Sequence, residues 1–166
     1  MLNINRDWLP ILVKQEQLLV FEKFNKDDAW NLGCKTIELI KTKYSNCKRG
    51  IAIQIFFEHT LVFSHLMETS NIENNWWMQK KLNTVYKTGM SSLRSLIEIE
   101  YGERKREAWC DDEGQYALCG GCIPIRLKDY SITGYLLISN LEHEYDHQLA
   151  ADALALIAGV DIPSII

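Results

Sequence analysis

The sequence contains no uninterrupted apolar run of about 18 residues, the length that a membrane-spanning helix needs. Its first residues carry Arg6, Asp7 and Pro10 among the apolar side chains, so they lack the continuous apolar core of a signal peptide. Basic residues are not in excess, because 18 lysines and arginines stand against 22 acidic residues and the net charge is −4. We therefore expect a cytoplasmic protein that contacts neither a membrane nor nucleic acid.

The composition also excludes a disordered chain and a small scaffold that depends on disulfides. Of 166 residues, 47% are hydrophobic and 24% are charged, which is typical of one globular domain with its own core. The number of cysteines, five, is odd, and no export signal precedes them, so we expect free thiols. The cysteines are Cys34, Cys47, Cys110, Cys119 and Cys122. Cys34 lies on the apolar stripe of a predicted helix, where we expect it to be buried.

Hydrophobic periodicity and turn signals predict an alternation of helices and antiparallel hairpins. The predicted order is a helix over 7–19, a strand over 20–24, a helix that begins near Asn25 or Asp27, a hairpin of strands 51–57 and 60–65, a long helix over 74–100, a charged loop over 103–115, a hairpin of strands 122–127 and 132–139, and a helix over 141–158. Two hairpins are incompatible with a series of βαβ units, so the predicted class is α+β.

Glycines are expected to interrupt this pattern at two helical positions. Gly89 falls within the long predicted helix, at a cost of about 1 kcal/mol relative to alanine. Gly159 follows the last predicted helix, as a glycine at the C-terminal cap should. The inward residues expected on that last helix are Tyr145, Leu149, Ala153 and Leu156.

Cys119-Gly120-Gly121-Cys122 has the C-x-x-C spacing of thiol–disulfide enzymes and of half of a zinc site. The residues after Cys122 alternate as a strand, whereas a redox motif places its first cysteine at a helix N-terminus. A zinc site would need two more ligands, and the spacing of His143 and His147 better fits an exposed pair on one helix face. We expect no metal site here, and instead expect the two glycines to let a backbone or a ligand approach closely.

Three stretches resemble one known family, the haem-binding GlcG/HbpS/PduO-C-like proteins, and in particular its uncharacterised branch. They are CGGCIPIR (119–126), ITGYLLISN (132–140) and DHQLAADAL (146–154), and FNKDDAWNLG (24–33) matches a further motif of the branch. An aromatic-led helix motif is also matched, by Trp77, Lys81, Asn83, Thr84, Val85, Ser91 and Ser92. The usual histidine of the branch is replaced here by Cys119.

The resemblance implies a fold and a broad function. It implies a single domain over residues 6–159 with a profilin-like fold, in which helices flank a five-stranded antiparallel sheet in α/β/α layers. It also implies a homo-oligomer, and haem or another tetrapyrrole as the first candidate ligand. Activities differ among such relatives, because a shared fold does not carry a function.

The candidate ligand site lies around the two glycines and the start of the last helix. A helix N-terminus favours a negative group on a ligand, and lysine or arginine could add charge for a small anionic ligand. The candidate site residues are Gly120, Gly121, Arg126, Ser139, Asp146 and Lys81. Asp146 has an alternative role, which is to accept hydrogen bonds from the free N–H groups at the start of that helix.

Three functional hypotheses remain open at this point. The preferred one is a homo-oligomeric small-ligand-binding protein, the second is an oligomeric scaffold that binds only protein partners, and the third is an enzyme that uses Asp146 or a cysteine thiolate. Self-association is also suggested by Trp76 and Trp77. Adjacent helical residues point about 100° apart, so both indoles cannot enter one core layer, and one is expected to make a subunit contact.

Overall fold

The computed structural model describes residues 2–46 and 49–166, so Cys47 lies outside the described residues. The helices are α1 (Trp8–Leu18), α2 (Lys26–Thr42), α3 (Ile72–Thr88), α4 (Ser92–Glu100) and α5 (His143–Ala158), with a short 3-10 helix η1 (Ala108–Asp111). The strands are β1 (Val20–Phe21), β2 (Ala52–Phe57), β3 (Thr60–Leu66), β4 (Cys122–Leu127) and β5 (Ile132–Ser139). The predicted α+β class and both predicted hairpins are confirmed.

The five strands form one sheet in the order β1-β4-β5-β2-β3. The hairpins β2–β3 and β4–β5 are antiparallel, and β5 and β2 also pair antiparallel. The short strand β1 instead runs parallel to β4, with Val20 opposite Arg126. The prediction of a purely antiparallel sheet was therefore wrong at this edge. A tight hairpin forces antiparallel pairing, whereas the chain between β1 and β4 is long enough to allow either direction.

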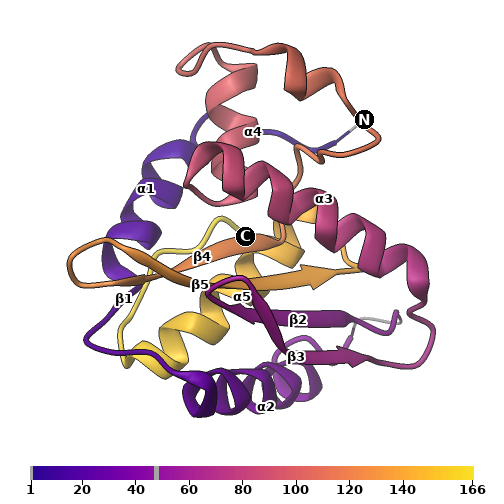
Figure 1. The fold of residues 1–166 in the computed structure, drawn as a ribbon, viewed down its shortest axis with the longest axis vertical. Coiled ribbons are helices and arrows are strands. Elements are labelled where there is room, and N and C mark those ends of the chain that lie inside the picture. Colours follow the sequence, from indigo (N-terminus) through magenta and orange to yellow (C-terminus); the bar gives the residue numbers. More distant parts are fainter. Residues whose placement is uncertain (1, 47–48) are drawn as a thin grey trace.

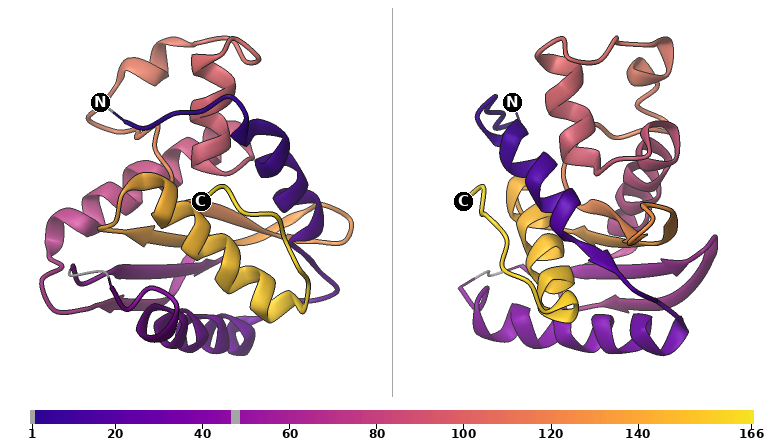
Figure 2. Two further views of the ribbon diagram at one scale, coloured as in Figure 1. Left: turned by 180° about the vertical axis from the view of Figure 1, so that it is seen from behind. Right: turned by 90° about the vertical axis from the view of Figure 1, so that its left-hand side faces the viewer.

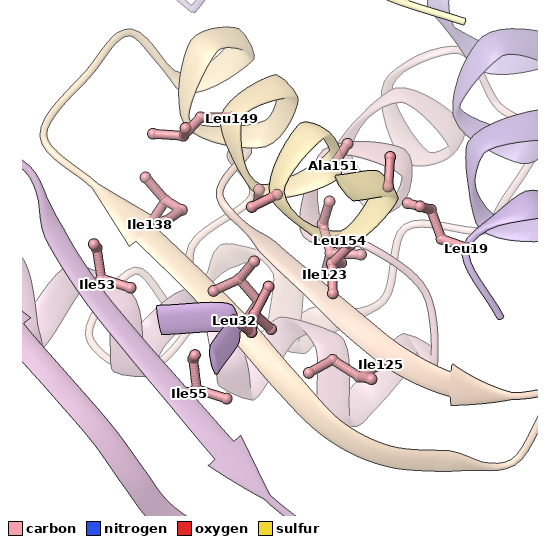
Figure 3. Packing of buried hydrophobic residues seen from close by; sticks show 14 of the residues in the cluster. Leu19, Leu32, Ile53, Ile55, Ile123, Ile125, Ile138, Leu149, Ala151 and Leu154 are labelled. Carbon is pink, nitrogen blue, oxygen red and sulfur yellow. The ribbon is translucent and has the colours of Figure 1, made fainter. Parts of the chain in front are cut away.

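Helices cover both faces of the sheet, as Figures 1 and 2 show. The largest core cluster lies between the sheet and helices α2 and α5 (Figure 3). It includes Leu32, Ile53, Ile123, Ile138 and Leu149. On the opposite face, α3 packs chiefly on β4 and β5 through a smaller cluster, whose helical members are Met78, Leu82 and Val85. A third cluster joins α1 to α4.

The long helix predicted over 74–100 is in fact two helices, α3 and α4. Gly89 ends α3 in the left-handed conformation, with φ 69° and ψ 11°. Ser91 then caps α4, because its Oγ accepts a hydrogen bond from the Arg94 N–H at 3.4 Å. A β-carbon at Gly89 would meet nothing within 4 Å, so the glycine is needed for its backbone conformation and not for close packing.

Two predictions of buried faces were wrong in part. Cys34 is exposed, because the face that α2 buries includes Leu32, Gly33 and Thr36. On α5, Leu149 and Ala153 are buried as predicted, whereas Tyr145 and Leu156 are 42% and 55% exposed. In both helices the periodicity indicated the correct kind of element. In α2 the predicted stripe lies one position from the observed one, whereas α5 buries a face broader than a single stripe.

The two histidines predicted to be exposed on the last helix are both buried, with 7% exposure for His143 and 2% for His147. His147 belongs to a polar network that ties α1 and α5 to the C-terminal segment. Its Nε2–H donates to Gln15 Oε1 at 2.9 Å, and Gln15 Nε2 donates to Gln148 Oε1 and to the carbonyl of Pro163. Periodicity could not reveal this burial, because the covering elements come from the two ends of the chain.

This network makes stability depend on pH. Burial, assisted by His143, lowers the pKa of His147 from 6.5 to about 3. The unfolded chain therefore takes up this proton near pH 6.5, whereas the folded chain resists it. The stability contribution is fully present above pH 6.5 and is lost as pH falls toward 3, by about 2 kcal/mol at pH 5.

In His147→Gln an amide can still donate to Gln15 but does not titrate. We expect the variant to lose less stability than the wild type between pH 7 and pH 5, as measured by urea unfolding. If the free energy of unfolding falls equally in the two proteins between pH 7 and pH 5, His147 does not cause the pH dependence.

Candidate functional site

A cavity of about 820 Å³ opens where β5 ends and α5 begins. The wall supplied by α3 includes Asn74, Trp77, Lys80 and Lys81. The segment from Ser139 to His143 forms a second wall, and residues of the loop around η1, including Cys110 and Tyr116, form a third. Its volume falls within the range of about 300–1,000 Å³ that is common for small-ligand sites.

A buried ion pair lies at the base of this cavity. Lys81 Nζ is 2.8 Å from Asp146 Oδ2, and the two side chains are only 4% and 3% exposed. Lys81 Nζ also donates to the carbonyl of Ile138 at 2.9 Å. Asp146 Oδ1 accepts from the Leu141 N–H at 3.0 Å. Asp146 therefore accepts from an N–H of the segment before α5 and not from a free N–H of the helix's first turn, as considered from the sequence, and it also neutralises a buried cation.

Burial and the ion pair act in opposite directions on these two groups. Burial alone would lower the pKa of Lys81, but the Asp146 carboxylate raises it above its ordinary value. Burial raises the pKa of Asp146 to about 6, and Lys81 opposes that rise. Near neutral pH the pair is thus an ammonium and a carboxylate, and the base of the cavity has no net charge.

The two glycines before β4 let parts of the protein approach one another. Gly121 has φ +121°, and a β-carbon there would lie 2.4 Å from the Ile138 oxygen and 2.5 Å from Lys81 Nζ. A β-carbon at Gly120 would lie 2.1 Å from the His143 oxygen. The close approach expected from the sequence is therefore made by β5, Lys81 and the first turn of α5, and the glycines support the cavity wall from behind.

The structure brings together most of the predicted site residues. Lys81, Ser139 and Asp146 line the cavity, and Gly120 and Gly121 lie directly behind it. Their role in ligand binding stays a prediction.

Arg126 lies at the other end of β4, where its guanidinium donates to the carbonyls of Tyr130 and Gly89. A strand rises about 3.3 Å per residue, which separates Arg126 from Gly121 by roughly 16 Å. Arg126 is therefore not part of this cavity.

Several cavity residues were not predicted. Trp77 and Lys80 are three positions apart on α3, and the Lys80 ammonium lies 5.2 Å from the Trp77 ring centroid. Helical spacing with Lys81 next to them could have indicated this pair. Arg49, Arg106, Cys110 and Tyr116 also line the cavity, but only the folded chain brings their distant segments together.

The thiol of Cys119 and the imidazole of His143 also line the cavity. Burial raises the pKa of Cys119, and the nearby Lys81 charge opposes that rise, so the thiol is neutral. The two ring nitrogens of His143 are both engaged. Nδ1 accepts from the Gly120 N–H at 3.2 Å, and Nε2 donates to the Asn3 carbonyl at 2.6 Å.

Within residues 2–46 and 49–166, no group of three or more histidine, cysteine or acidic side chains has the arrangement of a metal site. In the same part of the chain, no helix has the length and apolar character needed to cross a bilayer.

The fold and the cavity define an α+β protein with a helix-covered mixed sheet and an opening of ligand size at one end of the sheet. A family model described as haem degrading protein HbpS-like matches residues 24–155. The chain belongs to this HbpS-like family.

Relatives and solved structures agree with this assignment. A UPF0303 protein of Brucella canis is 30% identical over 158 residues, which cover 95% of this chain and 91% of that protein. A UPF0303 protein of Psychromonas ingrahamii is 31% identical over 148 residues, which cover 88% of this chain and 90% of that protein. The crystal structure of the Ybr137w protein superimposes with a TM-score of 0.81 and 26% sequence identity, and the match covers 93% of this chain and 92% of that chain.

The structure of a PduOC:haem complex superimposes with a TM-score of 0.64 and 17% sequence identity. The match covers 85% of this chain and 97% of that chain, and it shows a shared fold.

The buried ion pair generates a prediction about stability. Lys81→Met leaves the Asp146 carboxylate buried without a cation, and Asp146→Asn leaves the Lys81 ammonium buried without an anion. Each change should lower the free energy of unfolding by about 3–5 kcal/mol. The double variant removes both charges and should lose clearly less than the sum of the single losses.

Denaturant unfolding of the four proteins measures this coupling. Lys35→Met is a matched control, because Lys35 pairs with Glu38 on the surface and the two side chains are 42% and 63% exposed. The free energy of unfolding that Lys35→Met loses should stay below about 1 kcal/mol. Additive losses at Lys81 and Asp146 would contradict a coupled pair.

Proposed function

We propose that this chain is a cytoplasmic, homo-oligomeric protein that binds a small planar anionic ligand in the cavity, with haem or another tetrapyrrole as the first candidate. The observation that carries the proposal is the cavity itself, which is lined by aromatic rings, by charged side chains of both signs and by buried sulfur donors. The description of the family and the haem in the PduOC complex support this choice of ligand class.

The cavity wall carries charges of both signs. Its acidic lining residues are Glu73, Glu100, Glu113 and Glu142, and Arg106 is already paired with Glu100. Arg49 and Lys80 are the lining cations that could pair with a ligand carboxylate. Trp77 and Tyr116 also line it and offer aromatic faces to a planar molecule. The neutral Lys81–Asp146 pair below them does not repel an anion.

The donor set also fits a haem iron. Iron in haem proteins is held by histidine, cysteine thiolate, methionine or tyrosine. His143 is a poor candidate, because binding iron would break one of its two hydrogen bonds. Cys119 is the better candidate, since its thiol lines the cavity; iron would have to displace a proton that burial holds there, because burial raises the pKa of this thiol and Lys81 only opposes the rise. Bound haem would supply an iron centre for redox or gas chemistry.

The second candidate function is an oligomeric scaffold without a small ligand. It is favoured by the exposure of Trp76, which is 59% exposed and does not line the cavity. An enzyme that uses Asp146 or a cysteine is less well supported, because the Asp146 carboxylate already holds Lys81 and the turn before α5, and because burial keeps the Cys119 thiol protonated.

A haem titration followed by absorbance separates these functions. We expect a saturable spectral change in the wild type, and in Cys119→Ser we expect a shifted absorption band with weaker binding, because the sulfur ligand is lost. Cys34→Ser is the control, since Cys34 is exposed on α2 and does not line the cavity.

Each outcome has a distinct meaning. No spectral change in the wild type would exclude a tetrapyrrole and favour the scaffold. A spectral change that is identical in the wild type and Cys119→Ser would retain the ligand but exclude Cys119 as its donor.

A further inference from the structure

Two residues in the wall of the cavity have a backbone conformation that their side chains disfavour. Thr69 lies between β3 and α3, with φ +73°, and Asn140 directly follows β5, with φ +107°. Both residues line the cavity. A positive φ is uncommon outside glycine, and for a β-branched residue such as threonine it is an outlier. Strain of this kind persists only where the surrounding contacts enforce it, and it is found most often at ligand sites.

Both strained residues hold the same glycine. The Gly50 N–H donates to Thr69 Oγ1 at 2.7 Å, and Asn140 Nδ2 donates to the Gly50 carbonyl at 2.6 Å. The two hydrogen-bonding groups of Gly50 are thereby bound to side chains from two segments that are far apart in the sequence. We call Gly50, Thr69 and Asn140 together the clasp.

Close packing leaves the clasp little freedom. A β-carbon at Gly50 would lie 1.5 Å from the Glu68 oxygen, so no larger residue fits there. The Met67 N–H donates to the carbonyl of Ile51 at 3.1 Å, which ties the residue after Gly50 to the same turn. The backbone that directly follows Arg49 is therefore fixed relative to the cavity.

Arg49 is the side chain that the clasp places at the cavity. Gly50 has no side chain of its own, whereas Arg49 is exposed and lines the cavity together with Thr69 and Asn140. Consecutive α-carbons are only about 3.8 Å apart, so fixing Gly50 restricts the positions that the Arg49 guanidinium can reach.

Arg49 differs from the other cations of the cavity wall in its lack of a partner. The Lys81 ammonium and the Arg106 guanidinium pair with acidic side chains, and the Lys80 ammonium lies over an aromatic ring. Within residues 2–46 and 49–166, no ion pair or hydrogen bond engages the Arg49 side chain. Its donors are available to a ligand, and a guanidinium matches the two oxygens of a carboxylate.

We propose that Arg49 is the residue that selects ligands with a carboxylate group, and that the clasp holds it in position to do so. The inference rests on the proposed function, because it names the cation that recognises the acidic group of the ligand in that cavity. Arg49 is thus a specificity-determining residue, and Thr69 and Asn140 are positioning residues that act through it.

The acidic residues of the wall restrict where a carboxylate can bind. Glu73, Glu113 and Glu142 line the cavity and repel a ligand carboxylate near their own positions. A carboxylate is favoured only beside a cation that is not already neutralised. Of the two such cations, Arg49 offers a planar fork of donors, whereas the Lys80 ammonium is a point charge.

Haem and its dimethyl ester test the role of Arg49. The two molecules share the ring and the iron, but the ester has no carboxylate. We expect Arg49→Met to bind haem roughly tenfold or more weakly than the wild type, because a charge-assisted hydrogen bond is lost, and to bind the ester as the wild type does. Lys35→Met is the control, since it removes one positive charge from the surface of α2, outside the cavity, and should leave both affinities unchanged.

Asn140→Gly tests the clasp. Glycine adopts the φ of +107° without strain, so the fold should be retained, but the amide that holds the Gly50 carbonyl is lost. We expect weaker binding of haem and unchanged binding of the ester. In an Arg49→Met background the same change should add no further loss, because positioning acts only through the guanidinium. Circular dichroism of each variant checks that the fold is intact.

The outcomes distinguish this inference from the proposed function. Equal haem affinities in the wild type and folded Arg49→Met would overturn the inference and leave the cavity as the haem site. Equal weakening of haem and ester would also overturn it, because the change would then act on the cavity in general. A loss in Asn140→Gly that persists without Arg49 would overturn the positioning role. A wild type that binds neither molecule would overturn the proposed function, and the inference with it.

Discussion

The ion pair between Lys81 and Asp146 is the interaction on which the arrangement of this protein depends. It joins the middle of α3 to the first turn of α5. Lys81 also donates a hydrogen bond to the carbonyl of Ile138, near the end of strand β5. Each buried charge would be costly alone, so each requires the other in place. Gly121 completes the arrangement, because no larger residue leaves room for the ammonium.

The position of this pair explains why a cavity opens at that end of the sheet. The pair links α3 to the first turn of α5 at the end of the sheet, and the segment after β5 and residues of the loop around η1 supply the other walls of the cavity. The ion pair is electrically balanced, and the other lining side chains include aromatic rings and charges of both signs. Ligand selection is therefore expected to depend on the walls, and the pair is expected to hold their geometry.

Helix α3 has three differently used sides. One side packs on β4 and β5 through Met78, Leu82 and Val85, a second side lines the cavity with Trp77 and Lys80, and a third side presents Trp76 to solvent. A helix with three different neighbours has a weak amphipathic pattern, which is why its exposed tryptophans resisted a single interpretation.

Local chemistry in the sequence was sufficient for the kinds of elements, the two hairpins and the α+β class, and the resemblance of several motifs indicated the family. Alternation, caps and glycines act over a few residues, and they indicated β2, β3, β4 and β5 close to their observed bounds. The same local signals marked Asp146 as an acceptor for N–H groups at the start of α5, whereas its backbone donor is Leu141, which precedes the helix. They also led to Gly120 and Gly121 as points of close approach.

Only the tertiary structure decided which groups meet across long separations. The parallel pairing of β1, the burial of His147 under α1 and the partner of Lys81 all join segments far apart in the chain. Local periodicity carries no information on such contacts, because the covering residue lies outside any window that the pattern spans. Arg126 shows the converse, since it is near Gly121 in sequence but is carried away from the cavity by the rise of β4.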